Sequence, residues 1–322
     1  MTAKATRAEV RPDVRWINSI LAIKPLFNLA RFFAHRMMEK RAARMGFDWH
    51  EEVQRLRSRT PSPNPVPARS PLAPEWDTDR AELTNPDLTY PNYYLKPFHG
   101  YDQGDLCWDA ALEAEVAAYA VNARLWPDAG ASGRSRLRQS YIDVMQQQLP
   151  TSPQRILDIG CGVGLTTFAL QQTYPNAEIT GLDLSPYFLA VARYRSRQQQ
   201  LNIRWLHADA EQTGLPAASV DLVCAPIFFH ELPQDVARRI LAEARRLLRP
   251  GGHVAIMDIN PRSEAYRKMP AFILTLLKST EPYFDEYFAF DLEGAIAAAG
   301  FQAPRVTLNT PRHRTLIAQV RP

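Results

Sequence analysis

A buried-strand pattern that runs directly into an acidic residue and three alternating glycines constrains the fold of this chain more than any other feature. Residues 155–166 read RILDIGCGVGLT. The apolar, β-branched start of this stretch is typical of a strand inside a parallel sheet. The glycines that follow allow a sharp turn with positive φ and let a ligand lie against the backbone. The stretch therefore predicts a nucleotide-type cofactor site at the end of a buried strand.

The spacing of these glycines argues against a dinucleotide. Gly160, Gly162 and Gly164 form G-x-G-x-G. The dinucleotide fingerprint is G-x-G-x-x-G, and Leu165 stands where that fingerprint expects Gly or Ala. Asp158 points the same way, because a carboxylate in the turn would repel a pyrophosphate but attract an ammonium group. The expected ligand carries positive charge and no phosphate, which fits S-adenosylmethionine.

At these residues the chain resembles the class I S-adenosylmethionine-dependent methyltransferases, whose first motif is an acidic residue followed by G-x-G-x-G. Residues 179–185 read as a second strand that ends at Asp183, which can accept hydrogen bonds from both ribose hydroxyls. Residues 203–210 read as a third strand, and the resemblance implies that Asp209 faces the adenine amine with the Ala210 amide near the ring. The predicted cofactor-binding residues are Asp158, Gly160, Gly162, Gly164, Asp183, Leu184, Asp209 and Ala210.

The later segments follow the order of the same family. Residues 219–225 read as a fourth strand, and the LRPGG turn at 248–252 precedes a fifth strand at 253–258. Residues 305–308 and 315–320 read as a closing antiparallel pair. The resemblance implies an α/β, Rossmann-like class I methyltransferase fold. We expect a seven-stranded, mostly parallel sheet with helices on both faces and an antiparallel C-terminal strand pair.

The predicted organisation has three parts. Residues 1–57 form a basic helical extension, 58–91 a Pro-rich linker, and 92–322 the methyltransferase domain. Within that domain, the motif core spans 136–260 and an acceptor-side insertion spans 261–290. The nine prolines between residues 58 and 97 predict an extended tether without a helix or central strand.

Positive charge is concentrated in the extension. Residues 1–60 contain 13 Lys and Arg against 6 Asp and Glu, whereas the remainder contains 25 against 28. Pro25 is expected to open a helix with one apolar face and with Lys40, Arg41 and Arg44 near its end. Residues 16–45 could then make peripheral contact with an anionic membrane, or the helix could pack against the catalytic domain. Nucleic-acid binding is not favoured, because the catalytic half is slightly acidic and no stacking aromatics accompany the basic residues.

Composition favours a cytoplasmic location. No stretch reaches the roughly 18 apolar residues of a membrane span, and no signal-peptide pattern is present. The three cysteines Cys107, Cys161 and Cys224 show no metal-ligand spacing, so no metal site is predicted and a reducing compartment is expected.

Two aromatic segments are candidates for the acceptor pocket. Residues 92–108 are expected either to form a lid over the cofactor, excluding water and facing the sulfonium, or to dock the N-terminal helices. The insertion, with Phe272, Leu276 and Phe284 among its apolar residues, either roofs an acceptor pocket or packs on the sheet. Together with the basic arm and residues 281–287, the first segment resembles a group of cyanobacterial and plastid methyltransferase-domain proteins.

The implied chemistry is in-line displacement on the sulfonium methyl, with a general base only where the acceptor must lose a proton. His230, just past the fourth strand, is the candidate base; alternatively it begins the next helix together with Glu231. Residues 225–228 read APIF and lack the Asn/Asp-Pro-Pro-aromatic motif of adenine- or glutamine-directed enzymes. This favours a small-molecule acceptor with a carbon, oxygen or nitrogen nucleophile, and the apolar insertion favours an acceptor that is apolar or aromatic. The alternative is a cofactor-binding protein without catalysis that acts through partner or membrane contacts of its arm.

Overall fold

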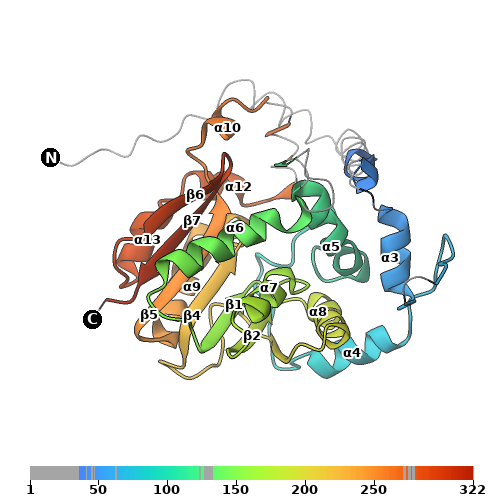
Figure 1. Ribbon diagram of the computed structural model, residues 1–322, viewed down its shortest axis with the longest axis horizontal. Coiled ribbons are helices and arrows are strands. Elements are labelled where there is room, and N and C mark those ends of the chain that lie inside the picture. Colours follow the sequence, from blue (N-terminus) through green and yellow to red (C-terminus); the bar gives the residue numbers. More distant parts are fainter. Residues whose placement is uncertain are drawn as a thin grey trace.

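A seven-stranded sheet forms the centre of the computed structural model (Figure 1). The structure describes residues 36–321 except 41, 45, 47, 62–63, 123–124, 127–132, 271–272, 275–276 and 278–279. The strand order is β3-β2-β1-β4-β5-β7-β6. The strands are β1 (Arg155–Ile159), β2 (Glu178–Asp183), β3 (Ile203–His207), β4 (Val220–Pro226), β5 (Leu248–Ile259), β6 (Arg305–Thr310) and β7 (His313–Gln319).

The pairing of these strands confirms the predicted fold class. β1 pairs in parallel with both β2 and β4, whereas β7 pairs antiparallel with β5 and β6. The chain crosses between β1 and β4 after building β2 and β3 on the other side, which makes the carboxyl ends of β1 and β4 a topological switch point. β5 begins at Leu248, earlier than predicted, and includes the LRPGG residues that were expected to form a turn. Open α/β sheets bind ligands at the carboxyl ends of their strands, beside such a switch point.

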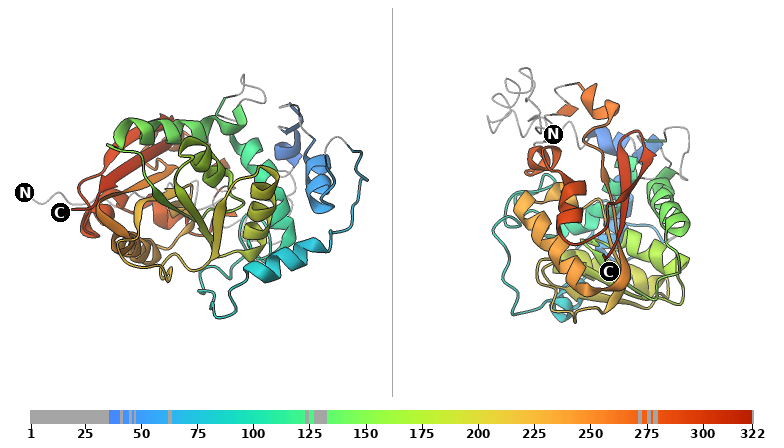
Figure 2. Two further views of the ribbon diagram at one scale, coloured as in Figure 1. Left: turned by 60° about the horizontal axis from the view of Figure 1, so that its bottom comes forward. Right: turned by 90° about the vertical axis from the view of Figure 1, so that its left-hand side faces the viewer.

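Helices cover both faces of the sheet, as the edge-on view in Figure 2 shows. In β1, Ile156 belongs to the apolar cluster under α6, whereas the next residue, Leu157, belongs to the opposite cluster under α9. This alternation is the two-residue period of a strand that is buried on both sides. The helices of these layers are α6 (Gly133–Gln148), α7 (Leu165–Thr173), α8 (Pro186–Gln198), α9 (Gln234–Leu247), α12 (Phe284–Phe288) and α13 (Leu292–Ala298), with the short η2 (Phe229–Glu231) and α10 (Glu264–Arg267) between them.

Local capping fixes the start of the helix that follows β2. The side chain of Ser185 accepts a hydrogen bond from the Phe188 amide, and Pro186 occupies the first turn of α8. Both are preferred at a helix N-terminus, because a hydroxyl satisfies a free amide there and proline has none to lose. The Asp183 carboxylate is thereby held directly before α8.

The N-terminal elements pack on the rest of the fold. α3 (Trp49–Arg57) lies against α5 (Trp108–Asn122), and its Trp49 and Leu56 are buried. Residues 36–40 and 42–44 are helical, and Ala42 is fully buried in the cluster that contains Trp49. Most of the predicted basic helix, including its start at Pro25, lies outside the described residues. No helix in the described part of the chain combines the length and apolarity that crossing a membrane requires.

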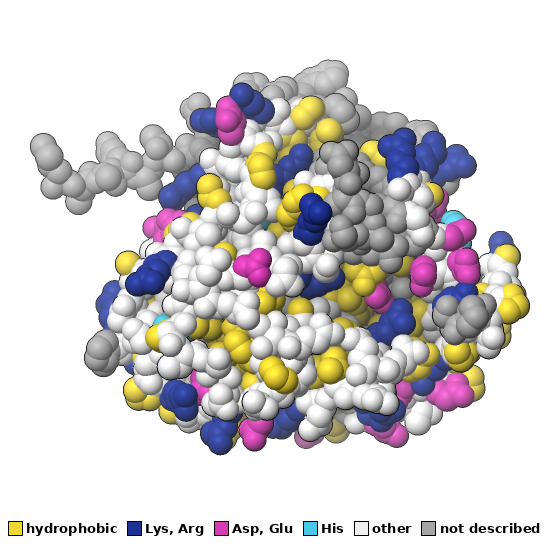
Figure 3. All heavy atoms as spheres, in the orientation of Figure 1, with side chains coloured by type: hydrophobic (Ala, Val, Ile, Leu, Met, Phe, Trp, Pro, Cys, Tyr) yellow, Lys and Arg dark blue, Asp and Glu magenta, His cyan; other side chains and the backbone are white. Residues whose placement is uncertain are grey.

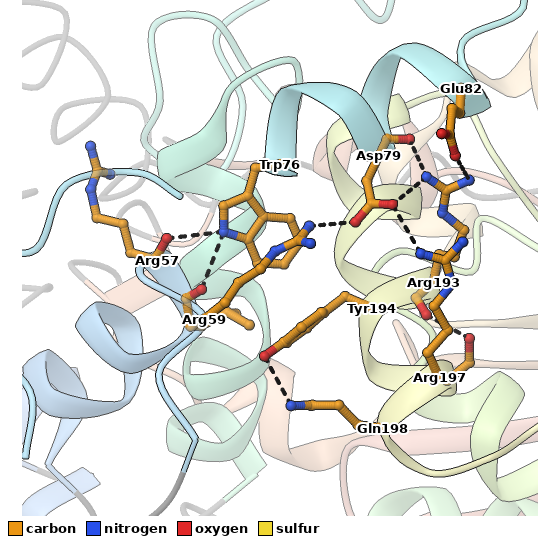
Figure 4. A network of polar contacts seen from close by, with 11 residues as sticks. Arg57, Arg59, Trp76, Asp79, Glu82, Arg193, Tyr194, Arg197 and Gln198 are labelled. Carbon is orange, nitrogen blue, oxygen red and sulfur yellow. Dashed lines mark hydrogen bonds and ion pairs between the residues drawn. The ribbon is translucent and has the colours of Figure 1, made fainter. Parts of the chain in front are cut away.

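The prediction that prolines exclude a helix from the linker is wrong for part of it. α4 (Glu75–Leu83) forms within residues 58–91, because no proline occurs between Pro74 and Pro86. This helix contacts α8, and its Trp76 is fully buried (Figure 4). The guanidinium of Arg59 lies 3.8 Å from the centre of the Trp76 ring. This part of the segment is therefore docked on the domain.

Surface charge is mixed on the face shown in Figure 3. Basic and acidic side chains are interspersed along its lower edge. On that edge, neither sign of charge forms a continuous patch among the described residues.

Candidate active site

The glycine turn after β1 is shaped by packing as well as by φ. Gly160, Gly162 and Gly164 have φ of +63°, +54° and +84°. A Cβ on Gly160 would lie 2.2 Å from the Phe228 ring, and one on Gly164 would lie 2.7 Å from the Trp205 ring. A Cβ on Gly162 would meet nothing closer than 3.9 Å. The first and third glycines therefore allow close approach of aromatic rings, and the second is required by its backbone conformation.

Asp183 is the best-oriented acidic group of the predicted cofactor site. Its Oδ2 accepts a hydrogen bond from the Gly162 amide at 2.8 Å, and its Oδ1 accepts one from the Ser185 amide at 2.8 Å. The carboxylate lines a cavity beside the glycine turn, called the main cavity below. Burial raises the pKa of this carboxyl to about 7. Each carboxylate oxygen keeps a further lone pair, so two ligand hydroxyls can still be accepted.

Asp158 lies deeper than predicted. It is fully buried within β1, and the Thr167 hydroxyl donates to its Oδ2 at 2.6 Å. Its Oδ1 is buried and has no hydrogen-bond partner in the described part of the chain, and burial raises the pKa of the carboxyl to about 7. Such an oxygen is costly to leave unpaired, which makes it a suitable acceptor for a cationic donor. Asp158 does not line the cavity itself, so its predicted contact with an ammonium group remains a prediction.

The main cavity joins the glycine turn to the aromatic segment before α5. It brings together five of the predicted site residues: Gly160, Gly162, Asp183, Leu184 and Ala210. The remaining lining residues are Tyr93, Tyr94, Phe98, His99, Asp105, Leu182, Phe188, Ile227, Phe228, Glu231 and Leu232. Gly164, Asp209 and His230 lie outside this lining. The Asp209 side chain accepts from the Glu211 amide at 2.8 Å and so stabilises its own turn.

His230 is at the predicted edge of the sheet, but its ring is paired with β5. Its Nδ1 lies 2.8 Å from Oδ1 of Asp258, which is fully buried. Burial alone would lower the pKa of His230, but the Asp258 carboxylate more than reverses this and raises it to about 9. The imidazole is therefore protonated at neutral pH, a state that cannot accept a proton.

A histidine that the sequence did not single out faces the cavity instead. His99 Nδ1 lies 3.1 Å from Oδ1 of Asp105, and its Nε2 lies 3.4 Å from an oxygen of Glu231 and 3.4 Å from one of Glu281. Burial would lower the pKa of His99, but Glu281 and Asp105 raise it well above its usual value. Burial also raises the pKa of Glu231, which His99 partly offsets. The aromatic residues around His99 drew attention to this segment, but no spacing linked it to Glu231 or Glu281.

The aromatic segment has residues placed as each of its two predicted alternatives requires, and its role as a lid stays a prediction. Tyr93, Tyr94 and Phe98 line the cavity, as a lid requires. Trp108 packs on Trp76, with ring centres 5.6 Å apart, as docking of the N-terminal helices requires.

For the described part of the insertion, the structure favours packing over the predicted roof. Phe284, Tyr287 and Phe290 are buried in the core beside α9, and none of the three lines the cavity. Phe272 and Leu276 lie outside the described residues.

Comparison with known proteins agrees with the fold and the glycine turn. Residues 156–252 match the family model of a methyltransferase domain. Residues 156–252 are therefore a methyltransferase domain, and the strand order around them is that of the predicted class I fold. The match falls within the predicted motif core, and S-adenosylmethionine is the cofactor of this domain.

Three curated relatives illustrate the range of matching methyltransferases. Demethylmenaquinone methyltransferase of Thermus thermophilus is 32% identical over 126 residues, which cover 39% of this chain and 55% of that protein. Malonyl-[acyl-carrier protein] O-methyltransferase of a Paenibacillus species is 31% identical over 163 residues, 49% of this chain and 53% of that protein. Ubiquinone biosynthesis O-methyltransferase of Coxiella burnetii is 32% identical over 130 residues, 40% of this chain and 53% of that protein. The chain thus spans about half the length of these relatives.

Cofactor affinity is expected to depend on pH through the buried carboxyls. Because the pKa of Asp183 is raised to about 7, lowering the pH protonates the group that is predicted to accept the ribose hydroxyls. Affinity for S-adenosylhomocysteine should therefore fall roughly tenfold at about pH 6. Calorimetry from about pH 5.5 to 8 measures this, and Asp183→Asn, which cannot titrate there, should give a flatter profile. A wild-type affinity that is independent of pH would contradict the assignment.

Proposed function

We propose that the chain transfers a methyl group from S-adenosylmethionine to a small, apolar or aromatic acceptor by in-line displacement. The observation that carries this proposal is the continuity of the main cavity. Its lining combines Gly160, Gly162 and Asp183 of the predicted cofactor site with apolar residues such as Phe98 and Leu232. A cofactor bound against the glycine turn would therefore share one cavity with an apolar acceptor.

The lining of the cavity suits this reaction. Aromatic rings exclude water and interact favourably with a sulfonium cation. Alignment of the nucleophile and the methyl group about 3 Å apart supplies several kcal/mol of the barrier reduction. Two of the matched relatives are named for demethylmenaquinone and ubiquinone, which supports an apolar or aromatic acceptor for this chain.

The test is metabolite profiling with an isotopically labelled methyl donor. Small-molecule extracts are incubated with the full chain, and labelled products are compared with those of Asp183→Ala, which is expected to bind the cofactor at least roughly tenfold more weakly. A labelled product made only by the wild type supports methyl transfer and identifies the acceptor. Cofactor binding without any labelled product would instead favour the non-catalytic alternative, in which the chain binds the cofactor and acts through its N-terminal arm.

We propose that His230 holds η2 against the end of β5 through its contacts with Asp258 and is not the general base. His230→Gln should keep turnover within roughly tenfold of wild type, below the 10²–10⁴-fold typical of a lost general base. It should lower the free energy of unfolding, because Asp258 loses its partner. Since the pKa of His230 is raised to about 9, the stabilisation is full below about pH 6.5 and disappears as the pH rises through 9. Denaturant unfolding from about pH 6 to 10 measures this, and a turnover loss above about 10²-fold with unchanged cofactor affinity would restore the base role.

A further inference from the structure

Three side chains from distant segments meet beside the main cavity, which His99 and Glu231 line. We propose that His99, Glu231 and Glu281 form a binding site for a divalent first-row metal ion such as Zn²⁺. His99 precedes α5, Glu231 ends η2, and Glu281 precedes α12. One ligand atom from each side chain lies within 4.8 Å of the other two. Imidazole nitrogen and carboxylate oxygen are both ordinary ligands of such ions.

The distances in this cluster match a shared ion better than direct hydrogen bonds. His99 Nε2 lies 3.4 Å from Oε1 of Glu231 and 3.4 Å from Oε1 of Glu281. Ligands of a tetrahedral ion with bonds of about 2.0–2.2 Å are separated by roughly 3.3–3.6 Å. A charge-assisted hydrogen bond between the same groups would be shorter, about 2.7–2.9 Å. Both separations therefore leave the space that a bridging ion needs.

The ring of His99 is oriented for metal binding. Its Nδ1 lies 3.1 Å from the buried Asp105 carboxylate, so that when a metal ion displaces the proton of Nε2 the remaining proton is held on Nδ1. A carboxylate behind a metal-binding histidine is the usual means of fixing its tautomer and orientation. The His99 amide also donates to the Thr280 carbonyl at 3.0 Å, which ties the ligand to the segment of Glu281. His99 has a φ of +50°, an unfavourable conformation that the surrounding contacts maintain.

The cluster contains more carboxylates than basic groups, which favours the binding of a cation. Three carboxylates, from Asp105, Glu231 and Glu281, surround one imidazole. Among the residues that the structure describes, Oε2 of Glu281 is buried and has no hydrogen-bond partner. An unpaired buried carboxylate oxygen is costly, and a metal ion would offset that cost. Because His99 and Glu231 line the cavity, the bound ion would be open to an oxygen atom of an acceptor.

The experiment is metal binding to the full chain without methyl donor or acceptor, so its outcome does not depend on the proposed methyl transfer. Chelator-treated protein is titrated with Zn²⁺, and with Mn²⁺ in parallel, by calorimetry. We expect one high-affinity Zn²⁺ per chain. His99→Ala and Glu281→Gln should weaken binding at least roughly tenfold, and Asp105→Asn, which removes the partner of His99, roughly 10–100-fold. The control Glu264→Gln, an exposed carboxylate on α10, should bind as wild type does.

A second measurement does not depend on variants that might misfold. Co²⁺ added to the wild type should give the visible absorption of a four- or five-coordinate ion, and excess Zn²⁺ should abolish it. Circular dichroism and thermal melting show whether each variant is folded. Wild-type Zn²⁺ affinity no higher than that of a folded His99→Ala variant, or a Co²⁺ spectrum identical to that of the hydrated ion, would overturn the proposal. The cluster would then be a protonated histidine held between carboxylates.

Discussion

Replacing Asp183 with alanine is expected to weaken the binding of S-adenosylhomocysteine at least roughly tenfold. The carboxylate should provide two charge-assisted hydrogen bonds to the ribose, each worth roughly 1.5–3 kcal/mol. It also accepts the amides of Gly162 and Ser185, so its loss loosens the glycine turn and the start of α8. Calorimetry with the full chain measures the affinity, and NADH should show no binding to the wild type.

Two further variants separate the parts of this effect. Asp183→Asn keeps one acceptor oxygen and should retain more affinity than Asp183→Ala. Asp209→Ala removes a carboxylate that lies outside the cavity lining and caps its own turn, so its effect should be smaller than that of Asp183→Ala. If Asp183→Ala binds S-adenosylhomocysteine as tightly as wild type does, the ribose assignment is wrong.

The sheet and its glycine turn were predictable because their signals are local. Residues 156–159 are buried, their apolar side chains alternate between the two faces of the sheet, and the glycines follow directly after the strand. The order of acidic strand ends then placed Asp183 at the ligand-binding edge, where the structure has it. Sequence also located the aromatic segment at 92–108, although it left open whether its rings face the cavity or the N-terminal helices.

The arrangement of the side chains around His230 and His99 was not predictable, because it depends on side-chain directions and on long-range contacts. His230 was placed at the correct strand end, but sequence does not report that its ring pairs with Asp258. His99, Glu231 and Glu281 come from three separate segments, so no motif spacing connects them. The absence of a metal site was inferred from cysteine spacing, which does not detect such a cluster. The helix at 75–83 was missed because the proline density was averaged over a segment that contains a proline-free stretch.

Replacing Asp79 with alanine is expected to lower the free energy of unfolding by about 3–5 kcal/mol. Asp79 is buried and lies 2.5 Å from both Arg59 and Arg193, whose side chains are 15% and 14% exposed (Figure 4). Burial alone would raise the pKa of Asp79, but the two arginines lower it below its usual value. Without the carboxylate, two guanidinium groups remain buried with less compensation, and Arg59 also loses a contact that holds it over Trp76.

Denaturant unfolding at pH 7 measures the change. Asp77→Ala, on the same helix but 63% exposed and 3.7 Å from Arg80, is the control and should cost less than about 1 kcal/mol. Equal effects of the two variants would mean that α4 is held by helix propensity and the burial of Trp76, and that the arginine pairs are dispensable.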